Sequence, residues 1–323
     1  MKLVLCFALI AVIALAPAKV KADRIRVAVQ KTGTLAWELD LIKRHGIDRK
    51  LDLTIDTIEL ASTEAGKVAL KGGSADLILS DWLWVAHERS LGDTLVFYPA
   101  SSALGAVMAP PSRSSIREVH DLKDKRLAVA GGPLDKSWLL LQAFALREGI
   151  DLKKQAIIVY GAPPLLSQKA LQGETDATLT YWNFSAELEN QGFRRAIAME
   201  TVVRGLGAKG PIAMVGYAFD GNWARRNPTT IERFLAAAQE AKEILATSET
   251  EWQRLAASLR INEPNALAVY RQRYSDGIVR RSLVEEEADA RALYLVLAQI
   301  GGAQLVGPTQ VLPPGTFYRP AGE

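Results

Sequence analysis

Cysteine is almost absent from this 323-residue sequence: the one cysteine, Cys6, lies in the apolar N-terminal run at residues 3–16. Lys2 precedes that run and small residues follow it, which is the pattern of a cleaved secretory signal peptide. Cleavage after Ala18 or Ala22 fits; we prefer Ala22, which makes residues 1–22 the signal peptide. A lipid-anchored cysteine would follow the apolar run, so we expect no lipid anchor. The mature chain then has no thiol and no disulfide, which suits an oxidising compartment.

A surplus of charge is also missing. Removal of residues 1–22 takes away Lys2, Lys19 and Lys21, which leaves 36 basic residues (39 − 3) against 36 acidic residues. A net-neutral chain lacks the basic surface that binds nucleic acid or an anionic membrane. No second apolar run is long enough to span a bilayer. We therefore expect neither a nucleic-acid partner nor insertion into a membrane.

Residues that carry enzyme chemistry are few. The three histidines, His45, His87 and His120, are far apart and form no helical i, i+4 pair, so we expect no zinc site. No serine lies in a nucleophile-elbow pattern. The segment 205–210 matches the glycine fingerprint of dinucleotide-binding loops, but a predicted strand follows it instead of a helix, and we interpret it as a hinge loop. We therefore expect no catalytic residue, no metal and no cofactor.

The sequence does contain one pattern twice, displaced by 100 residues (182 − 82). Residues 76–82 (DLILSDW) are echoed by residues 176–182 (DATLTYW), and residues 26–29 are echoed by residues 126–129. Two echoes with one offset indicate a duplicated α/β unit. Because open α/β sheets bind ligands at the carboxyl ends of their strands, we expect two lobes with a ligand between them.

Apolar runs of strand length alternate with helical patterns over the first two thirds of the chain, and helical patterns follow. This alternation predicts an α/β fold of two mixed, mainly parallel sheets with a helical C-terminal part. The segments 109–112, which includes Pro110, and 204–209 are the natural crossing points between two lobes, and two crossings form a two-segment hinge. We expect lobe 1 to comprise residues 23–109 and 205–323, and lobe 2 to comprise residues 110–204.

Five short motifs follow one another in a recognisable order and spacing, at residues 29–35, 69–76, 121–129, 171–182 and 223–228. With them the chain resembles the substrate-binding proteins of ABC importers, in the nitrate/sulfonate/taurine class that also includes thiamine-precursor binders. The resemblance covers essentially the whole mature chain. It implies a bilobal periplasmic-binding-protein fold of type II, in a protein that delivers a small solute to an ABC permease with its ATPase. We expect such a protein to act as a monomer.

The resemblance places the lining of the cleft in the turn at residues 32–37 and at corresponding ends of later strands. Glycines at a helix start let a ligand approach free backbone amides, which favour anions or polar oxygens. The strand-end argument agrees on these places. The candidate ligand-binding residues are Thr34, Trp37, Ser80, Asp81, Trp82, Ser102, Gly131, Gly132, Asp135, Tyr181, Trp182 and Asn183.

Two candidates, Asp81 and Asp135, allow a second interpretation. Each directly precedes a predicted helix, and Asp is a preferred N-cap, so each is either a cap or a ligand contact. Sulfonate-binding relatives tend to carry a small neutral residue where this chain has Asp81. A carboxylate there favours an amine, a hydroxyl or a protonated ring over nitrate or a simple sulfonate.

Five tryptophans follow predicted strand ends: Trp37, Trp82, Trp84, Trp138 and Trp182. Such rings either stack on a flat or cationic ligand or fill the interface between helix and sheet. We expect Trp82 and Trp182, which are equivalent in the two copies, to contact the ligand, and Trp84 to be structural.

Together these patterns predict a periplasmic receptor whose lobes close on a small organic solute. Its aromatic and acidic lining favours a heterocyclic, amine-bearing or zwitterionic solute. Two alternatives remain. One is an enzyme on the same fold, similar to a pyrimidine-precursor synthase, which would need a reactive His or Cys in the cleft. The other is a ligand-sensing partner of a signalling receptor.

Overall fold

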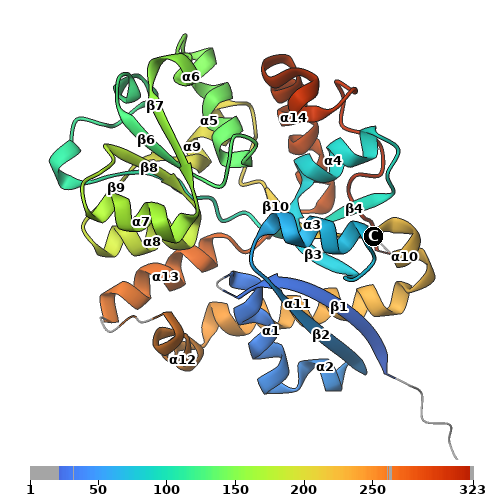
Figure 1. Ribbon diagram of the computed structural model, residues 1–323. Helices are drawn as coiled ribbons and strands as arrows, with labels where there is room; N and C mark the ends of the chain where they lie inside the picture. The colour runs from blue at the N-terminus through green and yellow to red at the C-terminus, as the bar shows by residue number, and fades with distance from the viewer. Residues whose placement is uncertain (1–21, 32, 260, 262–263, 321–323) are drawn as a thin grey trace, which may run out of the picture.

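The computed structural model describes residues 22–31, 33–259, 261 and 264–320. Apart from Ala22, the predicted signal peptide with Cys6 lies outside the described residues, and so does Thr32 of the predicted cleft lining. The described chain forms two five-stranded sheets, each with helices packed against it (Figure 1). This is the two-sheet α/β arrangement that the alternating pattern predicts.

The first sheet has the strand order β2-β1-β3-β10-β4. Its strands are β1 (Asp23–Gln30), β2 (Leu53–Leu60), β3 (Leu77–Asp81), β4 (Leu95–Ser101) and β10 (Val215–Asp220). The helices between these strands are α1 (Thr34–His45), α2 (Ile47–Lys50), α3 (Thr63–Lys71), α4 (Trp82–Ser90) and α10 (Gly221–Arg226). We call this sheet with its helices lobe 1.

The second sheet has the order β7-β6-β8-β5-β9. Its strands are β5 (Ala106–Ala109), β6 (Arg126–Ala130), β7 (Ile157–Gly161), β8 (Ala177–Thr180) and β9 (Arg194–Ala198). Its helices are η1 (Pro111–Arg113), η2 (Val119–Leu122), α5 (Lys136–Arg147), α6 (Leu152–Gln155), α7 (Pro163–Leu171), α8 (Trp182–Asn190) and α9 (Met199–Gly205). We call this part lobe 2.

The C-terminal part is helical, as expected. It consists of α11 (Pro228–Thr247), α12 (Glu249–Leu259), α13 (Pro264–Asp276) and α14 (Leu283–Val306). Helix α11 packs against α1 and β1 of lobe 1, whereas α13 packs against α8 of lobe 2 and α14 packs against both α4 and α5 (Figure 1). The C-terminal helices therefore join the two lobes. No described helix is long and apolar enough to cross a membrane.

The two sheets repeat one architecture. Strands β1 and β3, like β6 and β8, pair in parallel at an offset of 50 residues (77 − 27 and 177 − 127). In each unit an aspartate just before the second strand bonds to the first strand. Asp76 Oδ2 accepts the backbone N–H of Arg26 at 2.8 Å, and Asp176 Oδ2 accepts that of Arg126 at 2.9 Å. In each sheet an antiparallel strand, β10 or β5, comes next. The 100-residue echo in the sequence is therefore a repeat of structure.

The first crossing between the lobes lies earlier than we expected. Strand β5 pairs antiparallel with β8 and β9, so it belongs to lobe 2, whereas we expected residues up to 109 in lobe 1. The crossing is the segment 102–105, and Pro110 marks the end of a strand instead. Gly105 permits this close passage, because a Cβ atom there would lie 1.6 Å from the carbonyl oxygen of Thr180.

The second crossing, residues 206–214, is tied to the start of α14. Asp289 Oδ2 accepts the backbone N–H groups of Lys209 at 3.0 Å and Gly210 at 3.3 Å, and Glu286 Oε2 accepts that of Ala213 at 2.7 Å. Both carboxylates are buried, with exposed fractions of 3% for Asp289 and 1% for Glu286. Asp289 thus holds the end of the segment that we interpret as a hinge loop, and Glu286 holds the crossing just after it.

Trp82 is a core residue, contrary to the expectation that it contacts ligand. Its side chain is 0% exposed and lies in a hydrophobic cluster with Ile78, Val85 and Tyr294. Trp82 is the first residue of α4, and α14 covers that helix, which closes the space that a ligand would need. The indole therefore stabilises lobe 1.

Truncation of this ring tests the assignment. We expect Trp82→Ala to lower the free energy of unfolding by about 3–5 kcal/mol, because it leaves a large cavity in the core. Urea unfolding followed by circular dichroism measures the loss. Trp84→Ala is the matched control, since Trp84 is only half-buried and lies under Lys67 Nζ (5.4 Å from the ring centroid). Equal losses in the two variants would contradict the core assignment.

Glu286 gives the second crossing a pH dependence. Burial raises the pKa of Glu286 to about 7, although the hydrogen bond from Ala213 and the charge of Arg281 oppose the rise. The folded protein therefore holds this proton more tightly than the unfolded chain between about pH 4.5 and pH 7, and the free energy of unfolding falls as pH rises through that window. Glu286→Gln keeps an acceptor for Ala213 and removes the titration.

We expect Glu286→Gln to gain stability relative to the wild type, by about 1–3 kcal/mol, between about pH 5 and pH 8. Urea unfolding curves at several pH values measure the difference. A difference that stays constant over this range would show that Glu286 does not titrate there.

Candidate functional site

The predicted site residues cluster where helices begin after the parallel strands of each sheet. In lobe 1 these are the starts of α1, at Thr34, and of α4, at Asp81. In lobe 2 they are the starts of α5, at Asp135, and of α8, at Tyr181. We call the region between these four helix starts the interlobe site.

Trp182 joins the two lobes at this site. It opens α8 of lobe 2, and its ring packs against Trp37 of lobe 1, at a centroid distance of 6.0 Å, and against two rings of α13, at 6.4 Å to Tyr270 and 6.2 Å to Tyr274. Trp182 is 8% exposed and Trp37 is 7% exposed. The structure thus brings two predicted site residues together in a closed aromatic cluster. We did not predict Tyr270 and Tyr274; their only signal is an i, i+4 aromatic pair on a C-terminal helix.

Asp135 and Tyr181 form the centre of the lobe 2 side. Asp135 caps α5, because its Oδ1 accepts the backbone N–H groups of Ser137 at 2.9 Å and Trp138 at 3.3 Å. Its other oxygen accepts a hydrogen bond from the Tyr181 hydroxyl at 3.1 Å. Gly131 lies over this pair with φ +87°, and a Cβ atom there would lie 2.9 Å from the Tyr181 hydroxyl. Glycine is therefore required at that position.

Negative charge surrounds the Tyr181 hydroxyl. Burial raises the pKa of Tyr181, and the charge of Asp135, with smaller contributions from Asp81 and Glu64, raises it further. Burial also raises the pKa of Asp135. Asp81 and Glu64 belong to lobe 1, so carboxylates of both lobes raise the pKa of this phenol. Lys136 is the nearby cation, with its Nζ 5.3 Å from the centroid of the Tyr181 ring.

Asp81 is also a helix cap. Its Oδ1 accepts the backbone N–H of Trp84 at 2.8 Å, and Asp81 as a whole is half-buried. The cap interpretation is therefore correct for both aspartates, and contact with a ligand stays a prediction for both. The hydroxyls of Ser80 and Thr180, which precede Asp81 and Tyr181, are buried without a hydrogen-bond partner among the described residues.

Three further predicted residues are placed less centrally. Ser102 lies in the first crossing, where its N–H and its hydroxyl both donate to the carbonyl oxygen of Gly277, at 2.9 Å and 3.3 Å. Gly132 has open space around its α-carbon, and Asn183 is half-buried on the first turn of α8. The structure leaves Gly132 and Asn183 accessible to a ligand.

A small cavity of about 10 Å³ lies under Trp182, between the lobes, and Thr34 and Lys242 also line it. Its floor is a buried charge network that the sequence analysis missed. The carboxylate of Glu38 accepts hydrogen bonds from Lys242 Nζ and from the hydroxyls of Tyr274 at 2.9 Å and Tyr217 at 3.3 Å. Lys242 is 204 residues from Glu38, so no local pattern indicates the pair.

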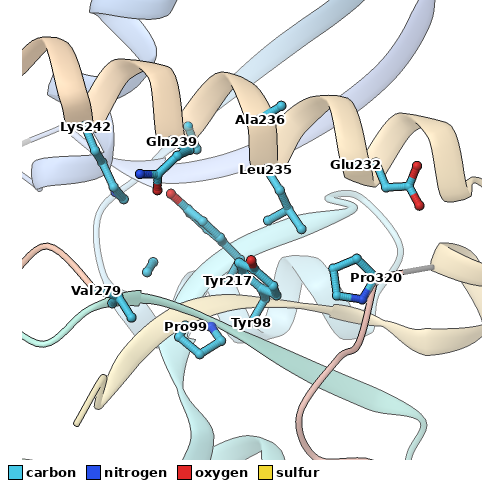
Figure 2. Close-up of a pocket in the computed structure, with 12 residues that line it drawn as sticks. Tyr98, Pro99, Tyr217, Glu232, Leu235, Ala236, Gln239, Lys242, Val279 and Pro320 are labelled. Atoms are coloured by element: carbon cyan, nitrogen blue, oxygen red, sulfur yellow. The ribbon is translucent and has the colours of Figure 1, made fainter. Parts of the chain in front are cut away.

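A larger cavity, of about 320 Å³, lies within lobe 1 rather than between the lobes. Figure 2 shows Lys242, Gln239, Leu235 and Glu232 of α11 along one side of it, with Val279 and Pro320 toward its two ends. It shares Ala100 and Lys242 with the small cavity. The residues that line it belong almost entirely to lobe 1 and α11, so movement of lobe 2 would not change its shape. The interlobe region, where both lobes contribute, stays the candidate site.

Within the described part of the chain, no group of three or more His, Cys, Asp or Glu side chains is arranged to hold a metal ion. His45 instead lies 2.9 Å from Glu251 Oε1, on the far end of α1 from Thr34. The chemistry available at the interlobe site is thus hydrogen bonding, charge and aromatic contact.

Removal of the Tyr181 hydroxyl tests the charge balance at the site. We expect Tyr181→Phe to raise the pKa of Asp135 further, because the hydrogen bond from Tyr181 favours the ionised carboxylate. Carbon-detected NMR of aspartate carboxyl groups measures the titration. Asp220→Asn is a control for the assignment, since Asp220 caps α10 elsewhere in lobe 1. An unchanged or lowered Asp135 pKa in Tyr181→Phe would contradict the geometry.

The comparisons with known proteins agree with this architecture. The chain is similar to the periplasmic aliphatic sulphonate binding protein SsuA from Escherichia coli (TM-score 0.73, 20% identity, 93% of each chain covered). It is also similar to the alkanesulfonate-binding protein SsuA from Xanthomonas axonopodis pv. citri bound to MOPS (TM-score 0.70, 20% identity, 92% of this chain and 98% of that chain covered). At such identities these likenesses show the fold alone, and they confirm the bilobal periplasmic-binding-protein fold.

Compared by sequence, the chain matches no curated protein but does match one family model. The model of the NMT1/THI5-like family matches residues 51–250, which extend from β2 to the start of α12 and so include all of lobe 2 and part of lobe 1. The chain belongs to the NMT1/THI5-like family.

Proposed function

We propose that this protein is the solute-binding component of an ABC-type importer, which captures a small organic solute between its lobes and delivers it to a transmembrane permease. The observation that supports this most directly is the burial of Trp182 of lobe 2 in the aromatic cluster of lobe 1. In this proposal the contact between Trp182 and Trp37 of lobe 1 forms as the lobes close, and closure around a solute is how a two-lobed receptor works.

The proposed binding sequence starts from an open form. The solute enters between the helix starts and contacts the backbone near Thr34 and near Gly131 and Gly132. It hydrogen-bonds Asp81 and Tyr181, and Asn183 faces it from the first turn of α8. Closure then returns Trp182 to lobe 1 and excludes water from the site.

The closed form docks onto the permease, and ATP hydrolysis by the transporter drives release. The receptor itself performs no catalysis in this proposal. Its N-terminal pattern directs it to the periplasm, without a lipid anchor, and its two lobes move about the crossings at 102–105 and 206–214. The two structural neighbours, whose names state sulfonate ligands, support the same class of function.

Native mass spectrometry of the freshly purified protein tests the proposal by showing which solute co-purifies. Titration of that solute should change tryptophan fluorescence, because Trp37 and Trp182 lie at the lobe contact. We expect Trp182→Ala to weaken the affinity for the solute at least tenfold, since it removes the buried ring of Trp182 and its aromatic contacts from the closed form. A thermal-shift screen of sulfonates, pyrimidines and amines replaces the titration if nothing co-purifies.

The matched control is Trp223→Ala. Trp223 is a half-buried tryptophan in α10, in the part of lobe 1 away from lobe 2 (Figure 1). It should leave the affinity unchanged. Equal affinities of the wild type and Trp182→Ala would remove Trp182 from the closing contact. A protein that binds no compound in either experiment would refute the receptor function.

A further inference from the structure

We infer that the solute carries a protonated amine or a similarly compact cation, and that this positive end lies at Asp81, opposite Tyr181. The inference rests on the proposed function and specifies the class of solute for the same site. It distinguishes this chain from the two structural neighbours, whose names state aliphatic or alkane sulfonates.

At the starts of α4 and α5, a carboxylate of the protein already occupies the position where an anionic ligand would bind. Free amides at a helix start attract anions, and a carboxylate cap satisfies those same amides. Asp81 occupies the start of α4, with Oδ1 2.8 Å from the Trp84 nitrogen, and Asp135 occupies the start of α5. A sulfonate placed at either start would meet a carboxylate and amides that are already bonded. Helices α1 and α8 have no side-chain cap, so their amides stay available for a neutral or negative oxygen at the other end of a solute.

The three carboxylates that raise the pKa of Tyr181 are not equally compensated. Glu64 lies 3.3 Å from Lys67 Nζ. Asp135 accepts three hydrogen bonds, two from backbone amides of α5 and one from Tyr181. Asp81 accepts a single hydrogen bond, through Oδ1, and forms no ion pair with any residue that the structure describes. A carboxylate has room for about four hydrogen bonds, so Asp81 has the capacity that a cationic N–H group needs.

A second observation points to a hydrogen-bonding ligand at the same place. Ser80 is 4% exposed and Thr180 is 1% exposed, and the hydroxyl of each has no partner among the described residues. Buried hydroxyls are normally paired. These two stand at equivalent ends of β3 and β8, directly before Asp81 and Tyr181. The strand ends of both lobes therefore contain polar groups whose partners the chain does not supply.

The cations near the site do not cancel this preference. Lys67 is used by Glu64, and Lys136 lies over the Tyr181 ring, 5.3 Å from its centroid. Lys242 lies below the site and is paired with Glu38. Asp81 is thus a carboxylate of this group that no described cation pairs with. A positively charged group of the solute supplies that partner.

Three probes with one ring and different charge test the inference: benzylammonium, benzyl alcohol and benzenesulfonate. Isothermal titration calorimetry measures their affinities for the wild type and for Asp81→Asn, in which the side-chain oxygen still caps α4 and the charge is gone. We expect benzylammonium to bind most tightly to the wild type, and to lose at least tenfold in affinity in Asp81→Asn. Benzenesulfonate should bind Asp81→Asn no more weakly than the wild type.

Asp220→Asn is the matched control, because Asp220 caps α10 through the N–H of Trp223 at 2.6 Å and lies outside the interlobe site. It should leave all three affinities unchanged. Tightest binding of benzenesulfonate, equal benzylammonium affinities for Asp81→Asn and the wild type, or no binding of any probe would each overturn the inference. The receptor function is judged separately, because it fails only if neither native mass spectrometry nor the thermal-shift screen finds a solute.

Discussion

The packing of Trp182 against lobe 1 is the contact on which the arrangement of the two lobes depends. A buried indole removes about 150–250 Å² from water, which at about 25 cal/mol per Å² is worth roughly 4–6 kcal/mol. That amount is comparable to the whole stability of many domains. The ring lies against Trp37 of lobe 1 and Tyr274 of α13, so in the proposed receptor its burial accompanies closure of the lobes.

The duplicated halves show how one sequence pattern can serve two purposes. Trp82 and Trp182 occupy equivalent positions, each as the first residue of the helix after an equivalent strand. The difference lies in the helix that covers each of them: α14 covers α4, whereas α13 approaches α8 from the opposite lobe. Trp82 is therefore sealed into lobe 1, and Trp182 becomes a contact between lobes. The C-terminal helices break the symmetry that the repeat creates.

The sequence predicted the features that depend on short stretches of residues. The alternation of strands and helices, the helix starts at Asp81 and Asp135 and the 100-residue repeat follow from residues near one another in sequence, and the structure has them. The first crossing was misplaced because Pro110 is a strong local signal, whereas the pairing of β5 with β8 joins residues about 70 positions apart. The Glu38–Lys242 network and the burial of Trp82 depend on the C-terminal helices, and no short pattern indicates them.

The closing contact and the charge at Asp81 act on each other. While the lobes are open, water can solvate this carboxylate at little cost. In the proposed receptor a solute that fills the interlobe site displaces water from the half-buried Asp81, and a carboxylate that loses water without gaining a cation is destabilised. A cationic solute offsets that cost and a neutral or anionic solute does not, so the cationic solute favours the closed form more strongly. Selectivity in this proposal therefore arises from the closing step itself.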